Sequence, residues 1–189
     1  MALDEFSRPR QTGINAINLR DDDELVDVKA TDGNQELILT TKFGQSLRFH
    51  EETVRPVHRN AMGVRGIKLR NADTLQAISV VEEDHLLTIT EQGFGKRTEF
   101  DEFRGHGRGT MGVRNIVVDA RGGGVVGSRA VSDDDEIIVM SASGIVIRTK
   151  VSEISIQKRG TRGVRIMRLG DGDRVIGFTI LDAEDREEA

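Results

Sequence analysis

Apolar and polar residues alternate along short stretches of the chain, and this pattern recurs about every 50 residues. Four glycines, 50, 49 and 51 residues apart, each open an apolar run: Gly13, Gly63, Gly112 and Gly163. A second apolar run begins 12 or 13 residues after each glycine, at Leu25, Leu75, Val125 and Val175. Short alternating runs of this kind indicate β-strands. A period near 50 held over four copies predicts an array of similar β units, such as the blades of a propeller.

Three of the four repeats also contain a predicted β-hairpin. The hairpins begin at Glu36, His85 and Glu136, and apolar and β-branched residues alternate on both sides of each turn. We place a glycine at each of the three turns, where positive φ is favoured: Gly44, Gly95 and Gly144. Repeats one to three are therefore expected to form four strands each, and the fourth repeat only its first two. No stretch combines helical periodicity with end caps, so little or no helix is expected.

The expected fold is all-β, a propeller-like array of four-stranded blades with about three and a half repeats. We predict one domain over residues 1–181, open or incomplete at both ends. Its repeats span about 1–50, 51–101, 102–151 and 152–181. Residues 182–189 form an acidic tail that is expected to be disordered.

The distribution of charge changes the meaning of the net charge. The formal net charge of −5 argues against a polyanionic partner. However, the tail contains five acids and one Arg, and without it 27 acidic and 26 basic residues remain. The basic residues gather in four leads, which are the turn-rich segments just before the marker glycines: residues 7–12, 55–62, 104–111 and 157–162. The charge therefore permits a polyanionic partner along one edge of the array.

Several classes of protein are disfavoured by composition. Because there are no cysteines, a disulfide framework or a thiolate metal site is excluded, which fits a reducing compartment. No apolar stretch has the length of a signal peptide or a membrane span, so a cytoplasmic location is expected. Aromatic residues make up 4% of the chain, with no Tyr or Trp, which argues against a single-strand binder that stacks bases.

Neither a metal site nor a cofactor site is predicted. The four histidines are scattered over different repeats without ligand-like spacing to acids, namely His50, His58, His85 and His106. The glycine-rich pieces at Gly105 and Arg121 lack the Lys-Ser/Thr ending of a phosphate-binding loop and are expected to be loops between strands.

The four basic leads have two interpretations. Because they fall at one position of a repeating unit, they would lie along one edge of the array, where a row of Arg and Lys offers an electrostatic path for a duplex backbone. The alternative is that they are solvated loops in which Arg favours solubility. Composition leaves both interpretations open.

Several phrases resemble a known family. They are GVRGIKL from Gly63, QGFGKRTEFDEF from Gln92 and VIRTKVSEISI from Val146, and the order of the repeats matches as well. The chain before the tail resembles the C-terminal β-pinwheel domain of the DNA gyrase A subunit, with the A subunit of topoisomerase IV as a close relative. This resemblance implies a disc of four-stranded blades, usually about six, whose basic rim wraps DNA. The chain resembles the last three blades and a closing half-blade.

The fourth lead is similar to the motif known in that family as the gyrase box, which has the form Gln, basic, Arg, Gly, Gly, basic, Gly. Gln157, Lys158, Arg159, Gly160, Arg162 and Gly163 fit this form, with Thr161 in place of one glycine. The family has the box in its first blade, whereas here the match lies in the last repeat. A weaker match runs from His106 to Gly112. The fourth lead is therefore expected to contact DNA.

The resemblance implies non-specific binding and bending of duplex DNA, presented to the catalytic core of a type IIA topoisomerase. Its partners would be duplex DNA, the catalytic core of the same polypeptide and the B subunit, at the nucleoid. Cleavage in that family needs a tyrosine from another region, and this chain has no Tyr, so no catalysis is expected from it alone. A protein-interaction propeller is the alternative. The predicted DNA-binding residues are Arg8, Arg10, Arg55, Arg59, Arg65, Arg104, Arg108, Arg114, Gln157, Lys158, Arg159, Arg162, Gly163 and Arg165.

Overall fold

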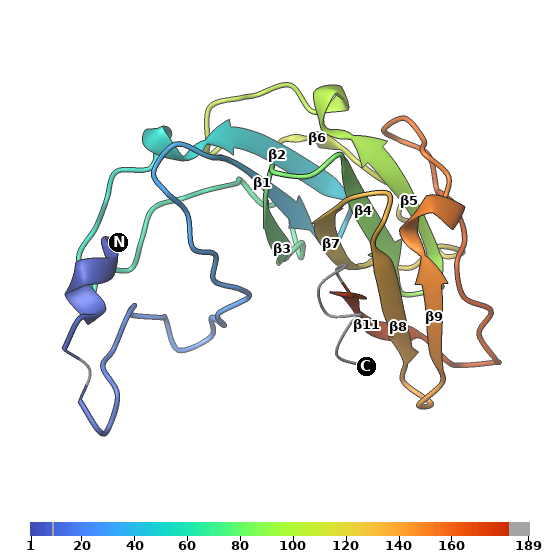
Figure 1. Ribbon diagram of the computed structural model, residues 1–189, viewed down its shortest axis with the longest axis horizontal. Coiled ribbons are helices and arrows are strands. Elements are labelled where there is room, and N and C mark those ends of the chain that lie inside the picture. Colours follow the sequence, from blue (N-terminus) through green and yellow to red (C-terminus); the bar gives the residue numbers. More distant parts are fainter. Residues whose placement is uncertain (9, 182–189) are drawn as a thin grey trace.

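Three antiparallel sheets follow one another along the chain, and each is built on one of the predicted hairpins (Figure 1). The computed structural model describes residues 1–8 and 10–181, so the predicted acidic tail lies outside the described residues. The first sheet has the order β3-β1-β2-β6 and consists of β1 (Glu36–Thr41), β2 (Gln45–His50), β3 (Leu75–Val80) and β6 (Val113–Arg114).

The second and third sheets repeat this plan. The second has the order β10-β5-β4-β7, with β4 (His85–Thr90), β5 (Phe94–Glu99), β7 (Val125–Val131) and β10 (Val164–Arg165). The third has the order β11-β8-β9, with β8 (Glu136–Ser141), β9 (Val146–Lys150) and β11 (Val175–Leu181). The helices of the described residues are four short 3-10 turns, η1 (Leu3–Phe6), η2 (Glu51–Thr53), η3 (Phe100–Glu102) and η4 (Val151–Glu153). The predicted all-β class is confirmed.

Each four-stranded sheet combines strands from three successive repeats. In the first sheet, the hairpin β1-β2 pairs on one side with β3 of the next repeat, as at Leu39 opposite Ile78. On the other side it pairs with β6, which is the run that follows Gly112 in the repeat after that. The second sheet takes β7 and β10 in the same way. The sheets are therefore completed by later parts of the chain, and sequence neighbours alone form only the hairpins.

The expectation that the first three repeats form four strands each is wrong for the first two. The apolar runs that begin at Gly13, Leu25 and Gly63 contain no strand. The reason is that the run after each marker glycine pairs with the hairpin two repeats earlier, and the second run pairs with the hairpin one repeat earlier. Among the described residues, no hairpin lies at the required one or two repeats before these three runs.

The turn glycine of the second hairpin is Gly93, and the prediction of Gly95 is wrong. Gly93 has a φ of 75°, matching Gly44 at 78° and Gly144 at 87°. Gly95 lies inside β5, opposite Ile89 and Val164. A Cβ there would lie 2.4 Å from Cδ1 of Ile166, so Gly95 allows close packing in place of a turn.

Three clusters of buried apolar side chains hold the sheets together. The largest joins the second and third sheets through Leu87, Ile89, Val131, Ile137, Val139, Val151, Ile154, Met167 and Val175. A second cluster lies within the first sheet, around Leu47 and Phe49. The third connects the first two sheets through Ile38, Leu86, Phe100 and Phe103. Since burying one large apolar side chain contributes about 1.5 to 3 kcal/mol, these contacts fix each sheet against the next.

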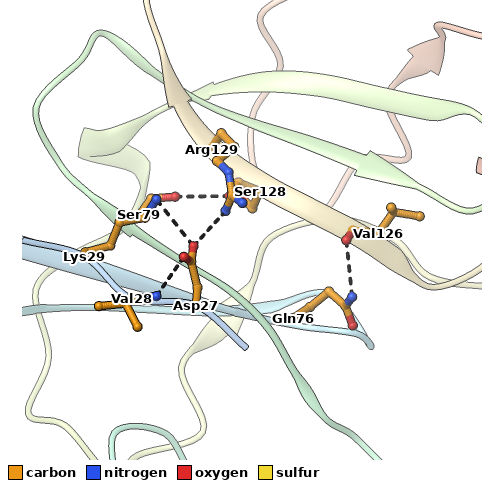
Figure 2. A network of polar contacts seen from close by, with 8 residues as sticks. All are labelled: Asp27, Val28, Lys29, Gln76, Ser79, Val126, Ser128 and Arg129. Carbon is orange, nitrogen blue, oxygen red and sulfur yellow. Dashed lines mark hydrogen bonds and ion pairs between the residues drawn. The ribbon is translucent and has the colours of Figure 1, made fainter. Parts of the chain in front are cut away.

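Polar contacts join β3 and β7 at the junction of the first two sheets (Figure 2). Gln76 Nε2 donates to the carbonyl oxygen of Val126 at 3.2 Å, and Ser79 Oγ donates to that of Ser128 at 3.1 Å. The carboxylate of Asp27 lies 3.3 Å from Nη1 of Arg129 and so attaches the N-terminal segment to this junction. These strands form the edge of each sheet that is opposite to β6 and β10.

Glycine is required where β6 and β10 begin. Gly112 has a φ of 67°, and a Cβ on it would lie 2.4 Å from the carbonyl oxygen of Ser46. Gly163 has a φ of 88°, and its Cβ would lie 2.3 Å from the carbonyl oxygen of Gly95. Gly63 has a similar φ of 77° but nothing within 4 Å. Gly112 and Gly163 therefore differ from Gly63 in that they lie very close to the backbone of the hairpin.

A buried lysine fixes the loops beside the second sheet. Lys96 in β5 has an exposed fraction of 0%, and its Nζ donates to the carbonyl oxygens of Asn115 at 2.8 Å and Lys158 at 2.7 Å. Lys158 lies in the fourth lead, so this one side chain connects the sheet to segments of two later repeats. Burial lowers the pKa of Lys96 to about 8, because the charged form is poorly solvated there.

The glycine contacts predict unequal effects of two similar substitutions. Both Gly63→Ala and Gly112→Ala place a side chain at positive φ, but only Gly112→Ala also pushes Cβ into a backbone carbonyl. Gly112→Ala should lower the free energy of unfolding by about 1 to 3 kcal/mol more than Gly63→Ala. Urea denaturation of the two variants measures this difference, and equal losses would contradict the close approach.

The buried lysine predicts a rise in stability at alkaline pH. Because the pKa of Lys96 is about 8 in the folded chain and 10.5 as its ordinary value, the unfolded state binds more protons between these values. The free energy of unfolding should therefore rise by about 2 kcal/mol between pH 7 and 9.5. The neutral amine can still donate to both carbonyls. The chain has no Tyr or Cys to titrate in this range. Urea denaturation across this range should show the rise, and Lys96→Met should abolish it; a flat profile for the unsubstituted chain would contradict it.

Candidate nucleic-acid interface

The third and fourth basic leads lie beside the second strands of the first and second hairpins, respectively. Gly105 forms a parallel bridge with Arg48 of β2, and Ile156 forms the equivalent bridge with Arg97 of β5. The run that follows each of these leads then becomes β6 or β10. The third and fourth leads are therefore held in place by the first and second sheets, respectively.

One repeated hydrogen bond joins each lead to the next. The backbone N–H of Asn18 donates to Ala61 at 3.1 Å, that of Lys68 donates to Thr110 at 2.8 Å, and that of Val117 donates to Thr161 at 2.9 Å. In every case, the run after one lead donates to the carbonyl oxygen of the following lead. The four leads thus form one connected series that crosses from sheet to sheet.

We call this series the basic band and define it as residues 6–8, 10–20, 54–70, 103–118 and 154–169. It contains sixteen of the 27 Lys and Arg residues of the chain and no Asp or Glu. Such a strip concentrates positive charge, although the flanking acids Glu5, Glu102 and Asp119 pair with three of its residues.

In the fourth lead, one cation is exposed and two others contact groups of the protein. Lys158 is exposed, while its carbonyl oxygen accepts from Lys96. Arg159 is half-buried, donates to the carbonyl oxygen of Arg114 at 3.4 Å and lies 3.9 Å from a carboxylate oxygen of Glu102. Arg162 forms an ion pair with Asp119, and this hydrogen bond lowers the pKa of the carboxyl group. The box-like segment therefore presents Lys158 outward and uses its two arginines to fix the loop.

The remaining residues of the box-like segment make contacts that also hold the loop in place. Gln157 is half-buried, and its Nε2 donates to Oγ of Ser155 at 3.0 Å. Gly160, at a φ of 72°, donates from its backbone N–H to the carbonyl oxygen of Asn115 at 2.7 Å. Gly163 directly precedes β10, and the guanidinium of Arg165 lies 4.7 Å from the centre of the Phe94 ring. This cation–π contact leaves Arg165 exposed on the band.

Arg108 of the third lead contributes to structure. Its Nε donates to the carbonyl oxygen of Thr53 at 2.7 Å, and its Nη1 donates to that of Arg65 at 3.2 Å. The side chain thereby connects the third lead to residues on either side of the second lead. Arg104 and Arg114 are exposed in the same segment.

The segment just before the first lead contacts the second lead. Arg55 and Arg65 are exposed, whereas Arg59 is half-buried and its backbone N–H donates to Oε2 of Glu5 at 3.1 Å. That hydrogen bond lowers the pKa of the Glu5 carboxyl group. Arg8 and Arg10 are exposed in the first lead.

All of the predicted site residues lie in the basic band, but they differ in solvent exposure. The exposed cations are Arg8, Arg10, Arg55, Arg65, Arg104, Arg114, Lys158 and Arg165, and the half-buried residues are Arg59, Arg108, Gln157, Arg159, Arg162 and Gly163. Sequence reasoning missed exposed cations that follow the apolar runs, namely Arg20, Lys68, Arg70 and Arg168. The same repeat period of about 50 residues was the feature of the sequence that could have revealed them.

The sequence analysis did not predict one group of possible metal ligands. Ligand atoms of Asp84, His85 and Asp133 lie within 4.8 Å of one another. Arg97 forms an ion pair with Asp133, so a cation from the protein already neutralises this acid. Separately, no helix of the described residues has the length and apolar character needed to cross a membrane.

Comparison with known proteins identifies the family. The family model described as the DNA gyrase C-terminal domain, a beta-propeller, matches residues 1–32, 35–82, 84–132 and 135–182. The A subunit of DNA gyrase from Salmonella typhimurium is 43% identical over 189 residues, covering 99% of this chain and 22% of that protein. Its counterpart from Staphylococcus epidermidis is 38% identical over 187 residues, covering 97% and 21%. The chain thus spans about a fifth of the length of these relatives.

Solved structures agree with this match. The C-terminal domain of DNA topoisomerase IV has a TM-score of 0.91 at 28% identity, covering 98% of this chain and 59% of that one. The DNA gyrase A C-terminal domain has a TM-score of 0.84 at 29% identity, covering 91% and 59%. The resemblance predicted from the sequence is confirmed. The chain belongs to the family of the DNA gyrase C-terminal β-propeller domain.

Proposed function

We propose that the basic band binds duplex DNA without sequence readout and bends it, as part of a gyrase A subunit. The observation that supports this most strongly is a connected row of exposed cations with no acid among its residues. Lys and Arg in such a row neutralise successive phosphates and release the counterions condensed on the duplex. Contacts of this kind position DNA without reading bases.

The arrangement of the sheets favours a bent path for the duplex. The band passes from the first sheet to the second, and the buried clusters fix the sheets against one another. A rigid series of cations can offset the cost of smooth bending, which is on the order of 1 to 6 kcal/mol for 20 to 30 base pairs. The engaged arginines, such as Arg108 and Arg162, keep the leads in fixed positions for that purpose.

The proposed partners follow from the relatives. The A subunits of DNA gyrase match this chain over a fifth of their length, so the rest of such a polypeptide and the B subunit are the proposed protein partners, at the nucleoid. Strand cleavage in this family uses a tyrosine, and this chain has none. Its proposed contribution is therefore to bind and present DNA to a catalytic core elsewhere.

The proposal predicts a steep dependence of duplex affinity on salt. If about six phosphates are neutralised, the slope of log K against log salt should be roughly −5. Substituting one exposed cation in each of three leads, Arg55→Ala, Arg104→Ala and Lys158→Ala together, should make the slope less steep by about 3. The same variant should lose fluorescence transfer between the labelled ends of a short duplex.

A matched triple variant controls for lost charge. Lys29→Ala, Lys42→Ala and Arg174→Ala also removes three cations, but these lie near acids, beside Asp27 in the first case and Glu91 in the other two. The slope and the bending should remain close to those of the unsubstituted chain. Equal losses from both triple variants would refute the band as the DNA path. A slope near zero for the unsubstituted chain would favour a protein-interaction scaffold.

A further inference from the structure

The second hairpin differs from the other two hairpins at its first residue. In the first hairpin this residue is Glu36, which forms an ion pair with Arg48. In the third hairpin it is Glu136, which forms an ion pair with Arg148. The second hairpin has His85 at this position, as the first residue of β4. An imidazole therefore stands where the other hairpins have a carboxylate.

The corresponding arginine of the second hairpin pairs with the next repeat instead. Arg97 is equivalent to Arg48 and Arg148, because each lies opposite the third residue of the first strand of its hairpin. Arg97 forms an ion pair with Oδ1 of Asp133, which lies in the loop before β8. The Nε of Arg97 also donates to the carbonyl oxygen of Ile154 at 2.6 Å. These contacts hold the Asp133 carboxylate beside the start of β4.

The imidazole of His85 has a buried nitrogen that is not hydrogen-bonded. The side chain is 11% exposed, and Nδ1 is buried without a hydrogen-bond partner among the described residues. Oδ1 of Asp133 lies 3.4 Å from this nitrogen. Because buried polar atoms are nearly always paired, a group that binds both the nitrogen and the carboxylate would complete the arrangement.

Asp84 provides a third possible ligand. One carboxylate oxygen of Asp84, one of Asp133 and a ring nitrogen of His85 lie within 4.8 Å of one another. Asp84 and Asp133 are exposed, so solvent ions can reach the group. Residues 82, 83, 134 and 135 are acids as well, so six acids lie in the two loops that enter β4 and β8. This concentration of negative charge favours a cation.

We propose that Asp84, His85 and Asp133 bind a divalent transition-metal ion such as Zn²⁺. An imidazole nitrogen suits Zn²⁺ and related ions, whereas Mg²⁺ and Ca²⁺ take oxygen ligands. Two ligands at about 2.0 to 2.1 Å from a tetrahedral Zn²⁺ lie about 3.3 to 3.4 Å apart, which matches the 3.4 Å between Nδ1 and Oδ1. The exposed carboxylate of Asp84 can turn toward the ion, and water completes the tetrahedron.

The arginine beside the site is compatible with a bound metal ion. A carboxylate has lone pairs enough to coordinate a metal and to accept a hydrogen bond at the same time. Carboxylate ligands are usually hydrogen-bonded to an outer partner that orients them. Arg97 takes this role toward Asp133, and the five other acids of the two loops offset its positive charge.

A metal ion at this place links two successive repeats. Asp84 and His85 lie at the start of β4 in the second sheet, and Asp133 lies just before β8 in the third sheet. The ligands come together only in the folded chain, so the ion stabilises the folded state over the unfolded one. This inference does not depend on the binding of DNA.

Calorimetric titration of the purified chain with zinc chloride tests the site. Excess magnesium chloride is present throughout, so that sites made of carboxylates alone are filled by Mg²⁺. The chain should bind Zn²⁺ at one site of this kind. His85→Gln should weaken this binding by about 100-fold and Asp84→Asn by at least about tenfold. Zinc should also raise the midpoint of thermal unfolding of the unsubstituted chain more than that of Asp84→Asn.

His58→Gln is the matched control. His58 also lies beside a carboxylate, at 3.1 Å from Oε1 of Glu5, but no third ligand joins this pair among the described residues. Its substitution should leave the zinc affinity unchanged. No zinc binding in the presence of magnesium would overturn the proposal, and so would equal weakening by His85→Gln and His58→Gln. If His85→Gln does not fold, unchanged affinity of the exposed variant Asp84→Asn would overturn it.

Discussion

The first two sheets depend on pairing between a hairpin and a Gly-Val-Arg run that lies two repeats later in the chain. This pairing requires Gly112 and Gly163, because any side chain at those positions would overlap a carbonyl oxygen of the hairpin. The same contact places the preceding lead beside β2 or β5. Folding and positioning of the candidate interface therefore rest on a single type of strand addition.

This dependence explains why cations in the leads have two roles. Arg108 and Arg162 donate to groups of neighbouring segments and hold the leads together, while Lys158 and Arg104 remain exposed. Lys96 adds a buried anchor beneath the fourth lead. Exposed cations on a fixed loop lose less entropy on binding a phosphate backbone than cations on a mobile loop. Rigid leads are thus compatible with the proposed bending of DNA.

The period and the local alternation of the sequence predicted the hairpins and the all-β class, while the resemblance of a few specific phrases to a known family predicted the family. The sequence did not reveal which hairpin each later run joins, since that choice depends on contacts between repeats. The Gly-Phe-Gly segment at residues 93–95 offered two candidate turn glycines, and only the backbone conformation distinguishes them. Likewise, the ion pair between Arg162 and Asp119 joins residues 43 apart. The sequence alone therefore could not show which arginines are exposed and which form contacts within the protein.

The central claim is that DNA lies along the basic band, and the protection of individual lysines tests it most directly. Lys68 and Lys158 are exposed on the band, whereas Lys29 lies near β3 and β7, at the opposite edge of the sheets (Figure 2). Acetylation of the chain with and without saturating duplex, followed by mass spectrometry, measures each lysine separately. Duplex DNA should protect Lys68 and Lys158 and leave Lys29 reactive. Protection of Lys29 with unchanged reactivity of Lys68 and Lys158 would contradict the account.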